Sequence, residues 1–305
     1  MRISTNTLFD GGSSRMGGLQ SKIDRTMQQL GSGSKLLTTA DDPVAAARVL
    51  EVGLSSASND QHARNRTQLR NSLSLVDGAM SSMSDTLKNI NDQVTTAGNA
   101  VLSDSELSVV AQELQGQFDQ LMSLANTRDG SGNYLFAGHQ TASPPYVKDA
   151  TTGALAYKGD QGQQLLPLDD SRKMAMSEAG SVLFAKDQNG ADLFSHLQAA
   201  ISALQPGQPA ATRSEKLAAL RTSSNETFSS VTRSQASVGI RLGELDQIDT
   251  QGIDRALQYA EIDSSLQALD YNEAASDLAR QQLALQAAQM SFQQVSKLSL
   301  FNYLG

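Results

Sequence analysis

The stretch that decides the fold is the C-terminal run IDSSLQALDYNEAASDLARQQLALQAAQMSFQQVSKLSLFNYL, residues 262–304, which contains neither proline nor glycine. Within it an apolar side chain recurs every seven residues, at Tyr271, Leu278, Leu285 and Phe292, and a second row follows three residues later. A seven-residue repeat split into three and four keeps one stripe of an α-helix facing a partner helix. We therefore expect one helix across this whole stretch.

A second apolar stripe begins on the far side of this helix, at Leu283 and Met290, and from residue 281 onward the one charged side chain is Lys297. A lone surface helix carries a charged face, so this helix is expected to be covered on more than one side. The expected partner is a short amphipathic helix near the N-terminus, from about Met16 to the glycine–serine run 31–34. If these helices lie outside the main bundle, we expect them to order on assembly. The residues expected at subunit interfaces are Leu19, Ile23, Leu30, Leu278, Leu285, Met290, Phe292 and Val295.

A second helical region follows a predicted helix cap at Asp41, Asp42 and Pro43, because a carboxylate before proline satisfies free N–H groups at a helix start. A long 4-3 alternation of apolar residues then runs to about residue 101, and Ser103 with Glu106 resembles a capping box that opens another helix. The helical pattern returns after residue 209. Two or more antiparallel helices therefore form the predicted bundle. Its predicted core is Leu73, Val76, Met80, Met83, Leu87, Ile90, Val94, Phe228, Val231 and Leu242.

The region between these helices has a different character, with prolines, glycine turns and strand-like pieces at 133–138, 154–158 and 164–168, and a helix near 192–204. We predict a mainly α fold: a long coiled-coil-like bundle formed by both chain ends, with a small, separate, mostly β domain inserted in the middle. The predicted division is 1–40 for the N-terminal helix, 41–140 for a helical hairpin, 141–208 for the insert, 209–261 for the return helix and 262–305 for the C-terminal helix.

Composition excludes several functions. The net charge of −8 and the lack of a basic face argue against a nucleic-acid partner. The chain has no Cys, and its three His residues are scattered, so we expect no catalytic residues, no metal and no cofactor. There is no apolar run long enough to insert in a membrane and no secretory signal peptide, which alone would favour the cytoplasm.

Several motifs together resemble the bacterial flagellin family: MRIST (1–5), LGSG (30–33), DDPVAAA (41–47), YLFAG (134–138), VGIRL (238–242) and FNYLG (301–305). The resemblance implies a non-enzymatic, extracellular structural subunit of the flagellum, exported unfolded through the type III apparatus without a cleaved signal and met by an export chaperone. The paired terminal helices would form an inner tube, the bundle the next shell, and the insert the outer surface.

Within that family, the short chain and the YLFAG motif favour a junction subunit between hook and filament, assembled as a ring of copies between a hook-associated neighbour and filament flagellin. One alternative is filament flagellin itself. Another, of a different class, is a flagellum-borne adhesive module that binds surfaces through the insert.

Overall fold

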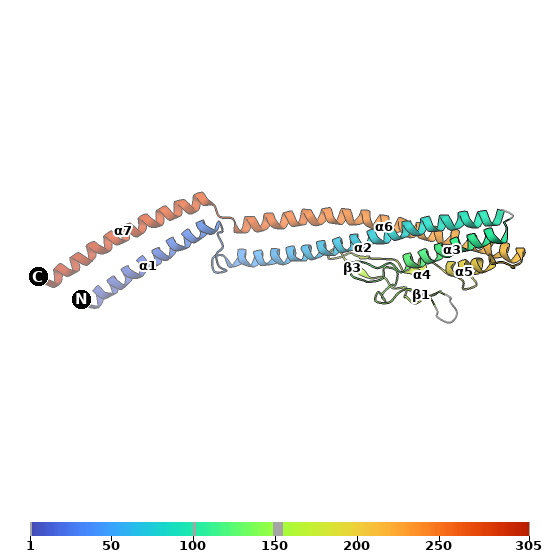
Figure 1. Cartoon of the computed structure of the whole chain (residues 1–305). Coiled ribbons are helices and arrows are strands. Elements are labelled where there is room, and N and C mark those ends of the chain that lie inside the picture. Colours follow the sequence, from blue (N-terminus) through green and yellow to red (C-terminus); the bar gives the residue numbers. More distant parts are fainter. Residues whose placement is uncertain (1, 100–101, 149–154, 305) are drawn as a thin grey trace. The chain divides into compact units, whose positions relative to one another are not determined.

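The computed structural model describes residues 2–99, 102–148 and 155–304, and most of these residues are helical (Figure 1). The predicted mainly α fold, with paired terminal helices and a small middle region of short strands, is confirmed. The helices are α1 (Arg2–Ser32), α2 (Pro43–Asn99), α3 (Asp104–Ala125), α4 (Gly180–Leu183), α5 (Leu193–Ala203), α6 (Ala210–Gln267) and α7 (Tyr271–Leu304). The strands are β1 (Tyr146–Lys148), β2 (Leu155–Tyr157), β3 (Leu165–Pro167) and β4 (Lys173–Ala175).

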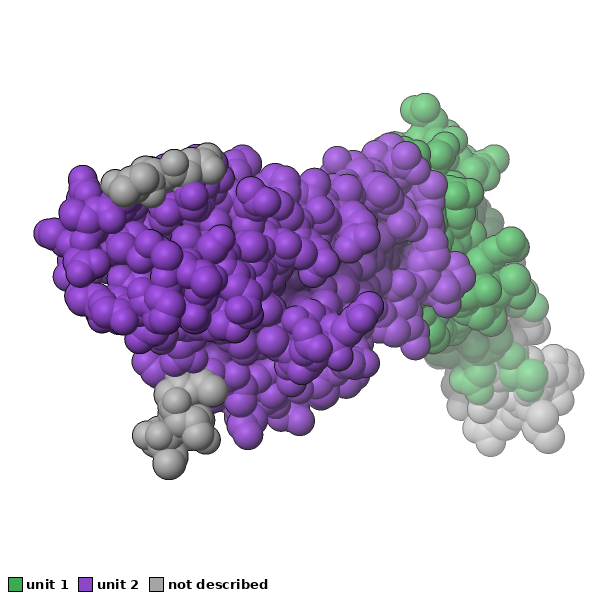
Figure 2. Space-filling view, turned by 90° about the vertical axis from the view of Figure 1, so that its right-hand side faces the viewer, with its two compact units in different colours: residues 1–58, 254–305 green, residues 59–253 purple. Residues whose placement is uncertain are grey.

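The chain divides into two compact units. The first comprises residues 1–58 and 254–305, so both chain ends contribute to it, and the second comprises residues 59–253. Figure 2 colours the first unit green and the second purple. Helices α2 and α6 each contribute residues to both units.

The second unit has a continuous apolar core in which α2, α3 and α6 contribute residues at heptad spacing. Of the ten residues predicted for the bundle core, eight are buried, while Phe228 and Leu242 are half-buried and pack against the same cluster. The predicted capping box is confirmed at the start of α3, where Ser103 Oγ accepts from the Glu106 N–H and the Glu106 carboxylate accepts from the Ser103 N–H. These local signals therefore specify the bundle helices correctly.

The middle region forms two separate antiparallel hairpins, β1–β2 and β3–β4, followed by α4 and α5. Its side chains belong to the bundle core: Phe194 of α5 stacks edge-on against Phe118 of α3, with ring centroids 5.7 Å apart, and contacts Tyr146 of β1. The described residues of the 141–208 region thus pack within the second unit. The five-part division of the chain stays a prediction about layers in an assembly.

The strand predicted at 133–138 is wrong, since this run forms turns and its one ladder contact is an isolated bridge between Arg128 and Tyr134. Gly138 has φ +72°, and a Cβ there would lie 2.1 Å from Asp160 Oδ1. The left-handed backbone and the close approach of Asp160 end any extended run. The strands predicted near 154–158 and 164–168 are confirmed as β2 and β3, with residue 154 outside the described residues.

Both terminal helices differ in length from the predictions. α1 begins at Arg2 and contains five glycines, although each glycine costs a helix roughly 0.5–1 kcal/mol relative to alanine. The predicted single helix over 262–304 is also wrong, because the chain leaves the helix at 268–270. There Leu269 N–H donates to Gly33 O at 3.2 Å, and Asp270 Oδ1 accepts from Asn272 N–H at 2.9 Å to restart the helix. Contacts with the opposite end of the chain therefore override the local sequence.

Candidate assembly interface

The candidate interface is built on the antiparallel pair of α1 and α7, which places the two chain ends side by side (Figure 1). Three residues of the seam between them are buried: Ile23 and Thr26 from α1 and Ala274 from α7. The predicted interface residues Leu19, Leu30, Leu278, Leu285 and Phe292 are half-buried in this single chain. One side of each terminal helix is thus covered by the other helix.

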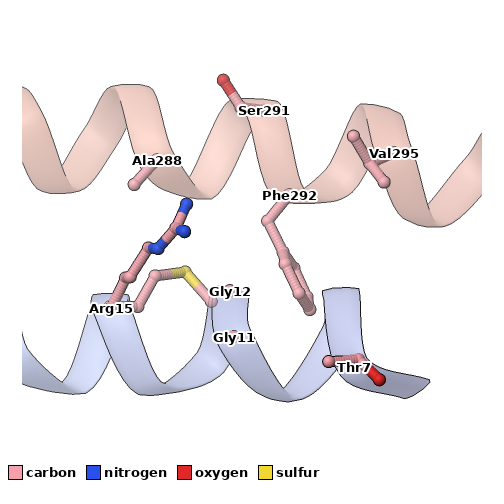
Figure 3. A pocket seen from close by; sticks show the side chains of 9 residues that line it. Thr7, Gly11, Gly12, Arg15, Ala288, Ser291, Phe292 and Val295 are labelled. Carbon is pink, nitrogen blue, oxygen red and sulfur yellow. The ribbon is translucent and has the colours of Figure 1, made fainter. Parts of the chain in front are cut away.

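An aromatic contact closes the seam toward the chain ends. Phe292 extends from α7 toward α1 (Figure 3), and its ring centroid lies 4.8 Å from that of Phe9. Gly12 makes room for this ring, because a Cβ at that position would lie 2.7 Å from Phe292 Cδ2. The glycine that weakens α1 as an isolated helix is therefore what allows the two helices to approach here.

A polar pair lies in the middle of the otherwise apolar seam, and sequence reasoning missed it. Thr26 Oγ1 lies 3.2 Å from Gln281 Oε1 and 3.1 Å from the backbone oxygen of Lys22. Both residues occupy seam positions in the heptad pattern, since Gln281 follows Ala274 by seven residues and Thr26 follows Leu19 by seven. A polar residue interrupting an apolar heptad was the available signal.

An open groove of about 630 Å³ lies along one flank of the helix pair. Gly11, Gly12 and Arg15 line it from α1, and Ala288, Ser291 and Val295 line it from α7 (Figure 3). Gly11, Gly12, Ala288 and Ser291 contribute small or absent side chains to this groove.

The far side of α7 remains uncovered in the single chain. Leu283 and Met290 are 68% and 63% exposed. Among the described side chains, ten of the seventeen exposed large apolar ones lie in the first unit, which holds about a third of the chain. Large exposed apolar patches mark interaction sites on soluble proteins, so this concentration points to association through the first unit.

The two predicted cap residues Asp41 and Asp42 have different roles in the structure. Asp42 Oδ1 accepts from the N–H groups of Val44 and Ala45 at 3.1 and 3.0 Å, which caps the start of α2. Asp41 instead accepts from Leu37 N–H at 2.7 Å and pairs with Arg25 of α1. Asp41 thereby ties the 33–42 loop to α1, a role that adjacency to proline did not reveal.

Titratable groups elsewhere have structural partners. The backbone N–H of Ala191 and, more weakly, that of Asn189 hold the pKa of Asp187 below its ordinary value despite partial burial, and the His196 ring, 3.1 Å away, acts in the same direction. Across the described ranges, no group of three or more His, Cys, Asp or Glu residues could hold a metal ion. Within the same ranges no helix is long and apolar enough to cross a membrane.

Comparisons with known proteins agree with this architecture. The family model for the bacterial flagellin N-terminal helical region matches residues 3–141. Flagellar hook-associated protein 3 of Salmonella typhimurium is 32% identical over 317 residues, covering 99% of both chains.

Solved structures share the fold. A putative flagellar hook-associated protein from Vibrio parahaemolyticus superimposes with a TM-score of 0.69 at 21% identity, covering 75% of this chain and all of that one. The flagellar junction protein FlgL from Legionella pneumophila gives 0.58 at 17% identity, covering 74% and 100%. Because the full-length relative exceeds 30% identity, the chain belongs to the family of flagellar hook-associated protein 3 and shares the N-terminal helical region of bacterial flagellins.

Proposed function

We propose that this chain is a structural subunit of the junction between hook and filament, which assembles as a ring and lets filament flagellin add beyond it. The single observation that carries the proposal is the exposed apolar surface of the first unit, exemplified by Leu283 and Met290 on α7. Full burial of such a side chain contributes about 1.5–3 kcal/mol relative to leaving it in water. A free subunit leaves that free energy unused, and association recovers it.

The names of the relatives support the kind of assembly. The Salmonella relative is a hook-associated protein and the Legionella structure is a flagellar junction protein. By analogy, this chain would leave the cell unfolded through the type III apparatus, after meeting an export chaperone, and act outside the cell in the flagellum. Its neighbours would be further copies, a second hook-associated protein and filament flagellin. Terminal helices would form the inner tube, the bundle the next layer, and residues 141–208 the outer surface.

Deletion of the gene in its host tests the proposal. We expect hooks without filaments in the electron microscope and flagellin shed into the medium, and complementation with the unchanged gene should restore filaments. Filaments of normal length on deletion cells would contradict an essential junction role. Growth of long filaments from the purified protein would favour filament flagellin, and intact filaments with lost attachment to surfaces would favour the adhesive module.

Substitutions at Met290 connect that test to the structure. Met290→Asp adds a charge to the exposed apolar stripe of α7 without touching the seam, so we expect the complemented cells to lack filaments. Met290→Leu is the matched control, since it keeps an apolar side chain of similar volume and should restore filaments fully. Equal filament counts for both variants would contradict burial of this side chain in the assembly.

A further inference from the structure

The seam between α1 and α7 is poorly specified by its apolar residues. Ile23, Leu278, Leu285 and their neighbours repeat every seven residues with similar side chains, so sliding one helix by seven residues, about 10 Å, again places apolar against apolar. Under the proposed function, the two chain ends must find each other after export. In a slipped pair, the exposed apolar residues of the two helices would be displaced along the helix axis and would no longer meet their contacts on neighbouring subunits.

Two features of the seam distinguish the observed register from a slipped one. The first is the Thr26–Gln281 pair, in which a buried hydroxyl meets an amide across the seam at 3.2 Å. A slip of seven residues places Thr26 opposite Ala274 or Ala288 and moves Gln281 away from Thr26, so the Gln281 amide loses its hydroxyl partner in the seam. Burying a polar group without a partner is costly. A single polar pair in an apolar seam is an established way to fix helix register.

The second feature is a backbone bridge at the end of the pair, between Ser34 and Ala268. Lys35 N–H donates to Gln267 O at 2.9 Å, and Leu269 N–H donates to Gly33 O at 3.2 Å. These bonds join the segment that follows α1 to the segment that precedes α7. They therefore fix the position of the two helices relative to each other along their common axis. The bridge also accounts for the break at 268–270, where the sequence contains no helix breaker.

We infer that the Thr26–Gln281 pair, acting with the Ser34–Ala268 bridge, selects the one register in which the chain ends pair. The pair and the bridge agree in the native chain, since both are formed in the same structure. If one partner of the polar pair is moved by a heptad, the polar pair forms only in a slipped register, whereas the bridge still favours the native register. Moving both partners by a heptad in opposite chain directions restores agreement, because the helices are antiparallel.

This reasoning gives a displaced variant and a restored variant of identical composition. The displaced variant, Gln281→Ala with Ala288→Gln, moves the amide seven residues along α7. The restored variant adds Thr26→Leu and Leu19→Thr, which moves the hydroxyl seven residues back along α1 to face position 288. Leu19 and Ala288 are both half-buried in the seam, so the exchanged side chains enter comparable surroundings. Each variant has the amino-acid composition of the native chain.

Register is read by cross-linking the purified full-length protein, so that the readout does not depend on filament assembly. The native chain has no Cys, so Lys22→Cys with Ala284→Cys introduces a single pair of thiols. These exposed positions lie one heptad from Arg15 and Ser291, which line the same groove. A short bis-maleimide should join them in the native register, and the cross-linked peptide is quantified by mass spectrometry.

We expect the displaced variant to lose both the Lys22–Ala284 cross-link and the filaments, and the restored variant to regain both. The inference is overturned if the displaced variant keeps the native cross-link yield, or if the restored variant recovers no more than the displaced one. The cellular readout rests on the proposed junction role, and the two can fail separately. Deletion cells that still carry filaments refute the junction role, whereas the cross-link yields judge the register on their own.

Discussion

Arg66 gives the sharpest test of what holds the second unit together. Its side chain is 3% exposed, its Nε lies 2.5 Å from Asp249 Oδ1, and its Nη1 donates to Leu168 O at 2.9 Å. Gly252 lies against the guanidinium, where a Cβ would be 2.3 Å from Nη2. This one side chain therefore links α2, α6 and the end of β3, three segments far apart in sequence.

Replacing Arg66 with Met keeps much of the stem but removes the guanidinium. Breaking a buried ion pair by removing one partner costs about 3–5 kcal/mol. We expect the lower end, about 3 kcal/mol, because Asp249 is 29% exposed and keeps its bond to Arg70. For a unit of this size, that loss lowers the melting temperature by roughly 6–12 °C.

Arg70 provides the matched control, since it contacts the same Asp249 carboxylate at 2.8 Å but its side chain is 39% exposed. Exposed ion pairs contribute about 0–1 kcal/mol, so Arg70→Met should shift the transition little. The assay is thermal unfolding of the full chain followed by circular dichroism at neutral pH. If Arg66→Met and Arg70→Met melt within a degree or two of each other, burial does not govern the strength of this network and the reasoning is refuted.

Three further predictions follow from other sites. Leu285→Asp places a charge in the α1–α7 seam, so complemented cells should lack filaments while the melting transition of the second unit stays unchanged; normal filaments would contradict the placement of Leu285 in a buried seam. Asp42→Ala removes the cap of α2 and should cost about 1 kcal/mol in a denaturant titration, with Asp42→Asn costing less because it keeps the accepting oxygen. At Asp169, burial opposes ionisation, but the N–H groups of Ser171 and Arg172 and the Arg172 guanidinium outweigh it and hold the pKa well below its ordinary value. Its contribution to stability is therefore fully present above the unfolded pKa near 4 and is lost as the pH falls toward the lower folded value. Asp169→Asn should flatten the acid limb of the stability curve, and an unchanged acid limb would assign that dependence to other carboxylates.

The parts of the candidate site that depend on local sequence patterns could be predicted, whereas those that depend on contacts between the two helices could not. The heptad rows identified both terminal helices as paired stripes, and the residues named from them lie in or beside the α1–α7 seam, with Ile23 buried and Met290 exposed on the far side of α7. The role of Gly12, which makes room for the Phe292 ring, could not be predicted because it depends on the position of the partner helix. The pairing of Gln281 with Thr26 depends on the partner helix for the same reason.

The sequence by itself determined the elements whose signals lie within a turn or two of each other: the capping box at Ser103, the cap at Asp42, and the apolar rows of α2 and α3. Tertiary structure alone decided the break at 268–270 and the partners of Arg66. A helix cap or heptad is satisfied by neighbours three or four residues away, so the chain displays it directly. Thr26 and Gln281 are 255 positions apart in the chain. The packing of the helices decides which polar groups meet over such a separation, because a polar group that is buried without a partner is costly.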